Sequence, residues 1–313
     1  MNTYYSNGKL LLTGEYLVLD KAKSLALPTK FGQSLSIQEI DEPKLIWESY
    51  THNNKLWLQI EFDLPKLRIV TATFDSNEDG GKDLLAETLQ KILFEAKKLN
   101  TNFLDNPQGF FVKSNLTFPR NWGLGSSSTL INNIAQWANT DAFQLQFNTF
   151  GGSAYDIACA QNNNPIIYQL IDKKPIIEPV IFNPTFKDQL YFVHLNKKQN
   201  SRESIRQYKK SGSNIEGVIE EISTLTYEAV KCSLVDDFEK IMSDHERIIS
   251  SIIKQKPVQE ELFSDYFGQI KSLGAWGGDF ILATGNMDTP NYFNKKGYPV
   301  VIPYQKMILC KKE

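Results

Sequence analysis

The sequence predicts an α+β protein. Its first 75 residues contain short apolar runs separated by turn residues, a pattern typical of β-strands. Between Asp83 and Leu99 the apolar residues change to helical spacing, and after a long helical stretch the end of the chain returns to strands. Strands and helices therefore alternate irregularly, which favours an α+β class.

Two apolar runs open the chain, Lys9–Leu12 and Tyr16–Leu19, on either side of a hairpin-like break at residues 13–15. Turn residues then separate four further segments that we expect to be strands. These segments are Phe31–Ile37, Lys44–Trp47, Leu56–Ile60 and Leu67–Phe74.

The middle of the chain predicts helix, strand and helix in turn. In Asp83–Leu99 the apolar positions follow the period of an amphipathic helix. Gly109–Leu116 is the next expected strand, and it leads into a loop with two glycines and several hydroxyl residues. That loop runs into an amphipathic helix that we expect to end near Asn139.

After Pro165 the pattern predicts short strands, then helices, then strands again. The first strands are Ile166–Leu170, Ile176–Ile181 and Leu190–Leu195, and the last are Phe280–Thr284 and Tyr298–Ile302. Between them, residues 201–273 are expected to be mostly helical, with breaks near Ser211 and at Pro257. A domain boundary is expected within residues 171–190, and we divide the chain into residues 1–180 and 181–313.

Composition excludes several classes of protein. The chain has 313 residues, 41% hydrophobic and 22% charged, with a formal net charge of −2. This near-neutral charge predicts no nucleic-acid or anionic-membrane partner, although a local basic pocket for a small anion remains compatible with it. Three widely spaced cysteines and three histidines without ligand spacing predict neither a disulfide framework nor a zinc site. The absence of a signal peptide or a long apolar run predicts a cytoplasmic protein.

The glycine- and serine-rich loop is the most informative segment. Gly123 and Gly125 permit tight turns and close approach of a ligand. The hydroxyl residues Ser126–Thr129 fall on the first turn of the expected helix, where free N–H groups and the helix dipole favour an anion. The alternative, a serine-capped helix after a glycine turn, stays open on this segment alone. The loop is neither a P-loop nor a good dinucleotide fingerprint, because it lacks the GK[ST] ending and has Ser128 where the third glycine should stand.

Three segments in order resemble the signature motifs of the GHMP kinases, the family of galactokinase, homoserine kinase, mevalonate kinase and phosphomevalonate kinase. Motif one is GKLLLTGEYLVL at residues 8–19, motif two runs from Pro119 to Ser128, and motif three is KSLGAWGGDF at residues 271–280. The resemblance spans nearly the whole chain. It implies an N-terminal domain of the ribosomal S5 domain-2-like type and a ferredoxin-like C-terminal domain. It also implies an ATP-dependent kinase that uses Mg²⁺, with ATP between the two domains.

The resemblance implies roles for residues in all three motifs. Lys9 matches the lysine of motif one, and Asp156 matches the aspartate of a G-S-G-x-D segment, so we expect these two residues to be catalytic. ATP is expected at motif two, with Ser126 on the phosphates and Ser127 on Mg²⁺. The expected ATP-binding residues are Pro119, Trp122, Gly123, Leu124, Gly125, Ser126, Ser127 and Ser128. The expected substrate-binding residues are Glu15, Tyr16, Ser153, Lys197, Arg202, Gly277 and Gly278.

The sequence also departs from the family pattern. Ala154 replaces the second glycine of G-S-G-x-D, and Trp276 replaces a small residue of motif three. Residues 142–155 contain no carboxylate at the place where mevalonate kinases usually carry a Mg²⁺-binding glutamate. Trp122 stands where small residues are usual, and it could face the nucleotide or fill a domain interface.

The residues found in the motifs and the missing glutamate indicate a small anionic alcohol as the phosphoryl acceptor, with phosphomevalonate first and mevalonate next. Such an acceptor implies a role in isoprenoid biosynthesis. Lys197, Lys198 and Arg202 could bind such an anion, or form a solvated basic turn. Two other functions remain open: a lyase like diphosphomevalonate decarboxylase, which Lys9 argues against, and a catalytically silent binding protein with this fold. We expect a monomer or a homodimer whose other partner is the small-molecule acceptor.

Overall fold

The structure is a computed structural model that describes residues 1–75, 82–105, 108–197, 205–206, 208 and 215–310. The chain forms two compact units, each built from several segments. The first unit contains Met1–Gly8, Phe31–Arg120 and Leu124–Gln161, and the second contains residues 9–30, 121–123 and 162–313. The division at residue 180 stays a prediction.

The first unit is built on a mostly antiparallel sheet with the strand order β5-β4-β3-β6-β2, in which only the β3–β6 pair is parallel. In β3 and β4, buried residues alternate with partly exposed ones, because successive side chains of a strand point to opposite faces. The strands are β1 (Asn2–Leu11, paired with β2), β2 (Ser24–Ile40), β3 (Lys44–Tyr50), β4 (Leu56–Asp63), β5 (Ile69–Phe74) and β6 (Gly109–Leu116).

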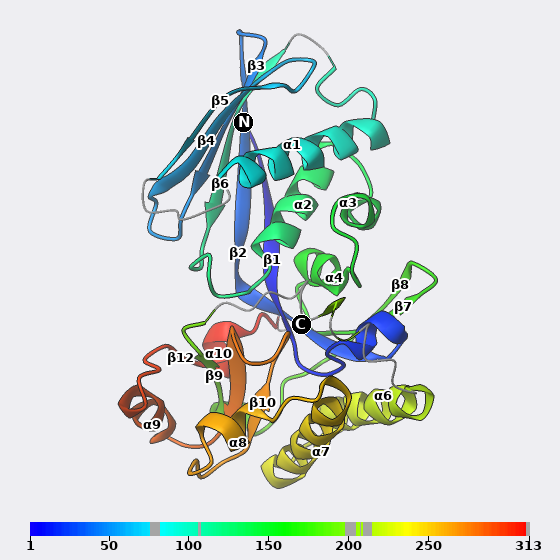
Figure 1. The fold of residues 1–313 in the computed structure, drawn as a ribbon, viewed down its shortest axis with the longest axis vertical. Helices are drawn as coiled ribbons and strands as arrows, with labels where there is room; N and C mark the ends of the chain where they lie inside the picture. Colours follow the sequence, from blue (N-terminus) through cyan, green and yellow to red (C-terminus); the bar gives the residue numbers. More distant parts are fainter. Residues whose placement is uncertain (76–81, 106–107, 198–204, 207, 209–214, 311–313) are drawn as a thin grey trace. The chain divides into compact units, whose positions relative to one another are not determined.

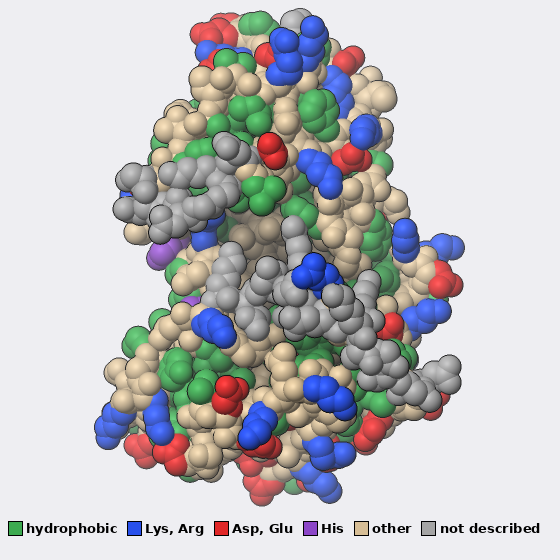
Figure 2. Space-filling view, in the orientation of Figure 1, with side chains coloured by type: hydrophobic (Ala, Val, Ile, Leu, Met, Phe, Trp, Pro, Cys, Tyr) green, Lys and Arg blue, Asp and Glu red, His purple; other side chains and the backbone are tan. Residues whose placement is uncertain are grey.

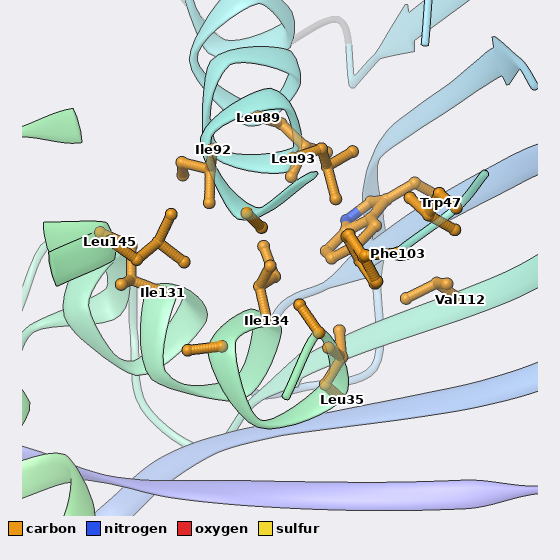
Figure 3. Packing of buried hydrophobic residues seen from close by; sticks show 14 of the residues in the cluster. Leu35, Trp47, Leu89, Ile92, Leu93, Phe103, Val112, Ile131, Ile134 and Leu145 are labelled. Carbon is orange, nitrogen blue, oxygen red and sulfur yellow. The ribbon is translucent and has the colours of Figure 1, made fainter. Parts of the chain in front are cut away.

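Four helices of the first unit lie together on one side of this sheet (Figure 1). They are α1 (Lys82–Leu99), α2 (Ser126–Trp137), α3 (Ala142–Thr149) and α4 (Tyr155–Gln161). Leu89 and Leu93 of α1 and Ile134 of α2 pack with Trp47 and Val112 of the sheet in one apolar core (Figure 3). Burial of these side chains at helical and strand periods explains why this half of the fold follows from the sequence pattern.

The second unit contains a hairpin and a separate antiparallel sheet with the strand order β10-β11-β9-β12. The hairpin β7–β8 pairs with Ser24–Ala26 at the start of β2. The strands are β7 (Ile166–Ile171), β8 (Lys174–Pro179), β9 (Leu190–His194), β10 (Ile270–Ser272), β11 (Phe280–Thr284) and β12 (Val301–Pro303). The helices are η1 (Leu17–Asp20), η2 (Lys187–Gln189), α6 (Glu216–Lys231), α7 (Val235–Ile253), α8 (Val258–Leu262), α9 (Thr289–Lys295) and α10 (Tyr304–Met307).

Most predicted elements are confirmed, including the first long helix, the strand at Gly109–Leu116 and the break at Pro257. The strand expected at Tyr16–Leu19 is wrong. Gly14 (φ +85°) and Tyr16 (φ +63°) adopt left-handed conformations that turn the chain into the short helix η1. Periodicity cannot separate a short buried strand from a buried turn of helix, and here tertiary packing decided.

Two further differences lie in the helical parts. The helix expected to continue to residue 273 ends at Leu262, and the chain then extends into β10. Gly268 lies between α8 and β10, and a Cβ there would lie 2.3 Å from the carbonyl oxygen of Thr284 in β11. A glycine therefore allows the chain to pass close to that strand. The helices α3, α4, α9 and α10 were not predicted, because each is at most about two turns long.

Among the described helices, none is long and apolar enough to cross a membrane. Lysine and arginine side chains are interspersed with aspartate and glutamate on the face that Figure 2 shows.

Candidate functional site

The N-cap position of α2 supplies no capping side chain, and in this sense the helix N-terminus is open. Gly125 is the N-cap residue, with φ +88°. Ser127 is exposed and Ser126 is partly exposed, whereas Ser128 is buried and donates to the carbonyl oxygen of Gly125 at 2.8 Å. The first-turn N–H groups and the hydroxyls of Ser126 and Ser127 can therefore meet an anion. The Ser128 hydroxyl serves the helix instead.

Gly123 shows why motif two needs a glycine at this position. Its φ is +66°, and a Cβ built on it would lie 2.3 Å from the carboxyl carbon of Asp279. Asp279 itself is held at the backbone, where its N–H donates to the carbonyl oxygen of Lys197 at 2.7 Å. Any side chain at residue 123 would displace the Asp279 carboxylate, so the two motifs are fitted to each other within the second unit.

Trp122 packs against the sheet of its own unit. Its ring meets Phe280 edge-on, with centroids 5.5 Å apart, and lies 6.2 Å from the His194 ring. His194 also approaches the carbonyl oxygen of Asn121, at 3.3 Å from Nε2. These contacts attach residues 121–123 to β9 and β11 and support the interpretation of Trp122 as a packing residue.

Asp156 lies in the first turn of α4, after a sequence of left-handed residues. Gly151, Gly152 and Ala154 have φ values of +68°, +85° and +59°. Ala154 is buried in a conformation that glycine adopts without strain, which explains why the family pattern has a glycine there. The sharp turn buries Ser153 and leaves Asp156 partly exposed. A partly exposed carboxylate on a tight turn can reach a substrate hydroxyl.

A polar network that the sequence analysis missed connects α4 to α2, with Ser6, Asn132 and Asn133 buried and Gln161 exposed. Gln161 Nε2 donates to Asn132 Oδ1 at 2.9 Å, and Asn132 Nδ2 donates to Ser6 Oγ at 2.8 Å. Ser6 Oγ in turn donates to Asn133 Oδ1 at 2.7 Å. Satisfied buried polar groups fix the register of the elements that carry them, here the helices of Asp156 and of motif two. In the sequence, two adjacent asparagines among the apolar residues of the predicted helix indicated such a network.

The predicted site residues of motif one differ from one another in exposure. Lys9 is on β1 and is partly exposed, whereas Glu15 and Tyr16 are buried. The Tyr16 hydroxyl donates to the carbonyl oxygen of Ala275 in motif three at 3.0 Å. Trp276, with φ +51°, is buried in the same apolar cluster as Tyr16. Motifs one and three are thus packed together in the second unit.

Glu15 is part of a buried ionic cluster whose other members the sequence analysis did not single out. Glu15 Oε1 is 2.6 Å from Lys271 Nζ, and Glu246 Oε1 is 3.5 Å from the same ammonium. His245 Nε2 lies 3.3 Å from Glu15 Oε2. Burial raises the pKa of Glu15 to about 7 against the opposing effect of Lys271, and it also raises the pKa of Glu246. Burial, reinforced by the Lys271 charge, lowers the pKa of His245 well below its usual value.

The structure describes most, but not all, of the remaining predicted site residues. Lys197 is exposed, Gly278 is buried, and Gly277 is partly exposed with φ +72°. Lys198 and Arg202 lie outside the described residues. Pro119 is partly exposed and Leu124 is fully buried.

In the part of the chain that the structure describes, no three His, Cys, Asp or Glu side chains form a group that could hold a metal ion. The donor set nevertheless fits Mg²⁺ bound through a nucleotide, because this ion takes one or two protein oxygens and otherwise phosphates and water. The exposed Ser127 hydroxyl next to the open helix end supplies such an oxygen.

The fold is that of the GHMP kinases, as the sequence predicted. Over 99% of this chain and 98% of the other, the structure matches mevalonate kinase from Methanococcus jannaschii, with a TM-score of 0.70 and 16% identity. Phosphomevalonate kinase from Streptococcus pneumoniae, in complex with phosphomevalonate and AMPPNP, matches over 100% and 99%, with a TM-score of 0.66 and 16% identity. Galactokinase from Lactococcus lactis, complexed with galactose, matches over 94% and 88%, with a TM-score of 0.65 and 14% identity. No family model and no curated protein matches the sequence.

Proposed function

We propose that this chain is an ATP-dependent kinase of a small-molecule alcohol. The observation that carries the proposal is the open N-terminus of α2, with Gly125 in a left-handed conformation and Ser126 and Ser127 accessible. The α2–α4 polar network adds a partly exposed carboxylate, Asp156, on a helix that is fixed relative to this anion site. The fold shared with kinases, one of them in complex with AMPPNP, supports ATP as the nucleotide.

The residues perform the tasks that phosphoryl transfer demands, which are mostly positioning and charge stabilisation. The first turn of α2 and Ser126 would bind phosphate oxygens, and Ser127 would hold Mg²⁺. Asp156 orients the acceptor hydroxyl and takes its proton. Lys9 stabilises negative charge on the transferring group. Bound ATP would supply the phosphoryl group, and Mg²⁺ would neutralise part of the charge on its oxygens.

A panel of alcohols monitored by coupled ADP release tests the activity. Release of ADP that depends on the added alcohol, without CO₂, supports the kinase. Alcohol-dependent CO₂ release supports the decarboxylase alternative. ATP binding without turnover of any alcohol supports a silent binding protein.

Gly125→Val is expected to weaken binding of a non-hydrolysable ATP analogue strongly. A β-branched residue is strained at φ +88° and obstructs the approach of phosphate to the backbone. Isothermal titration measures the affinity. Gly297→Val is a matched control, because Gly297 has φ +90° with open space around its Cβ position and is followed by no helix N-terminus. Unchanged affinity in a folded Gly125→Val variant would place the nucleotide elsewhere.

We further propose an anionic acceptor, phosphomevalonate first and mevalonate next. A chain with net charge −2 must supply cations locally, and Lys197 is exposed next to motif three, with its carbonyl oxygen bound by Asp279. The phosphomevalonate complex of the Streptococcus pneumoniae enzyme, which has the same fold, supports this choice.

Replacing both Lys197 and Arg202 by alanine is expected to raise the acceptor KM much more than the ATP KM. Each lost charged hydrogen bond is worth roughly 1.5–3 kcal/mol. Replacing the exposed Arg247 and Lys295 by alanine removes the same charge from other surface positions and should change neither KM. An unchanged acceptor KM in the first variant would exclude these residues, and ADP release with another acceptor but not with phosphomevalonate would exclude the substrate.

A further inference from the structure

The buried cluster in the second unit contains more negative than positive charge. Its charged groups are two carboxylates, Glu15 and Glu246, and one ammonium, Lys271; each of these side chains is at most 3% exposed. The fourth member, His245, is fully buried as well. A net buried charge without compensation is very unfavourable, so the cluster must either bind a proton or admit a cation.

The hydrogen bonds of His245 show that the imidazole is not the site of that proton. The backbone N–H of Gly14 donates to His245 Nε2 at 2.9 Å, so Nε2 provides a lone pair. The ring is therefore neutral, with its hydrogen on Nδ1, which has no acceptor among the described residues. If Nε2 were protonated, two N–H groups would point at each other. The burial of His245 next to Lys271 acts in the same direction by lowering its pKa.

The same nitrogen indicates which carboxylate oxygen holds the proton. Glu15 Oε2 lies 3.3 Å from His245 Nε2, and it has no hydrogen-bond partner among the described residues. The single lone pair of Nε2 already accepts from Gly14, so an ionised Oε2 faces no donor here, whereas a hydroxyl on Oε2 can share that lone pair with the Gly14 N–H in a three-centre hydrogen bond. Glu246 differs, because the Ser272 hydroxyl donates to its Oε2 at 2.9 Å and its Oε1, although it has no hydrogen bond, faces the Lys271 ammonium at 3.5 Å. Burial raises the pKa of Glu15 to about 7, which agrees with a carboxyl that keeps its proton.

We propose that Glu15 is a positioning residue, whose carboxyl joins the motif-one turn to β10 and α7 while it retains a proton on Oε2. Oε1 accepts from Lys271, the first residue of motif three, and the Oε2 hydroxyl lies 3.3 Å from His245 Nε2 on α7, where it shares the lone pair with the Gly14 N–H. The Thr13 and Thr226 hydroxyls, 2.7 Å apart, hold the same turn to α6. Its 0% exposed side chain gives Glu15 no contact with substrate. This role of Glu15 in the fold does not depend on the proposed function. Only an effect of Glu15 on catalysis would depend on it.

The proton that Glu15 retains predicts that the contribution of this residue to the stability of the folded state falls as the pH rises. A group whose pKa is raised on folding stabilises the folded state fully below its unfolded value near 4.5, and the contribution is lost as pH rises through about 7. The groups that face Glu15 are Lys271 from β10 and His245 and Glu246 from α7. His245 has the opposite slope, because its imidazole stays neutral in the folded state but takes up a proton in the unfolded chain below about pH 6.5. Glu15→Gln retains His245, so a comparison of the two proteins cancels this contribution.

The experiment compares unfolding of the full chain by denaturant at about pH 5.5 and about pH 8. Relative to Glu15→Gln, the wild-type folded-to-unfolded ratio should fall by at least about tenfold between these pH values. Glutamine resembles the protonated carboxyl, since its oxygen accepts from Lys271 and its N–H₂ group takes the place of the hydroxyl beside His245. The exposed Glu228→Gln is the matched control and should keep the wild-type slope. Equal slopes in wild type and Glu15→Gln would overturn the proposal.

Two further measurements separate positioning from mere burial. Glu15→Ala should be less stable than Glu15→Gln at both pH values, because it cannot hold Lys271 or His245. Equal stability of the two variants would overturn the positioning role. The nitrogen chemical shifts of His245 should show a neutral ring with its hydrogen on Nδ1 throughout this pH range. A protonated His245 would overturn the assignment of the proton to Glu15. None of these readouts depends on kinase activity, so they stand or fall separately from the proposed function.

Discussion

Replacing Asp156 by asparagine is expected to lower kcat by about 10²- to 10⁴-fold, while the affinity for ATP changes little. Asparagine keeps the size of the side chain but cannot accept the proton of an alcohol. The loss therefore falls on the transition state rather than on nucleotide binding. Steady-state kinetics of ADP release gives kcat, and titration with a non-hydrolysable ATP analogue gives the affinity.

Asp141→Asn provides the matched control for this experiment. Asp141 is the N-cap of α3, where its side chain accepts from the N–H of Phe143, and asparagine caps a helix equally well. The control should keep wild-type turnover. Wild-type turnover in Asp156→Asn would instead remove Asp156 from the reaction, and loss of ATP binding in that variant would show that its role is structural.

Lys271→Met is expected to destabilise the folded protein severely. Lys271 is the only cation within ion-pair distance of Glu15 and Glu246 among the described residues, and its side chain is 1% exposed. Removing one partner from a buried ionic group costs about 3–5 kcal/mol, because the remaining charge has lost its compensation. For a chain of this size we expect the melting temperature to fall by roughly 10 °C. Thermal unfolding followed by circular dichroism measures the change.

The Lys271→Met defect should also grow with pH, because both carboxyl groups must then remain protonated in the folded state. Adding Glu15→Gln and Glu246→Gln to Lys271→Met removes the uncompensated charge and should recover much of the lost stability. Lys306→Met, at an exposed position, controls for loss of a lysine and should have little effect. A Lys271→Met protein as stable as the wild type would mean that the ionic cluster does not stabilise the fold.

Much of the fold could be predicted from the sequence because its signals are local. The apolar positions of α1 repeat with a helical period, and the strands from β3 to β6 alternate or are bounded by turn residues. Long-range packing was needed where a segment is short. Tyr16–Leu19 has the composition of a strand, but positive φ angles at Gly14 and Tyr16 turn it into η1.

The candidate site divides in a similar way. Motif two is visible in the sequence because glycines and hydroxyl residues before a helix have a direct physical role at its N-terminus. The partners of Glu15 were not visible, because Lys271 and His245 lie more than 200 residues away along the chain. An isolated lysine or histidine in a sequence does not reveal the carboxylate that it meets after folding.

The sequence by itself determined the α+β class, the order of the main elements and the three motifs, because each depends on residues close together in the chain. Only the tertiary structure decided where the Glu15 carboxyl lies. Motif wording placed it with the substrate-binding residues, whereas the fold buries its carboxyl against Lys271 and His245. Burial and the charges of distant neighbours set the pKa of a carboxyl group, and the fold brings those neighbours together.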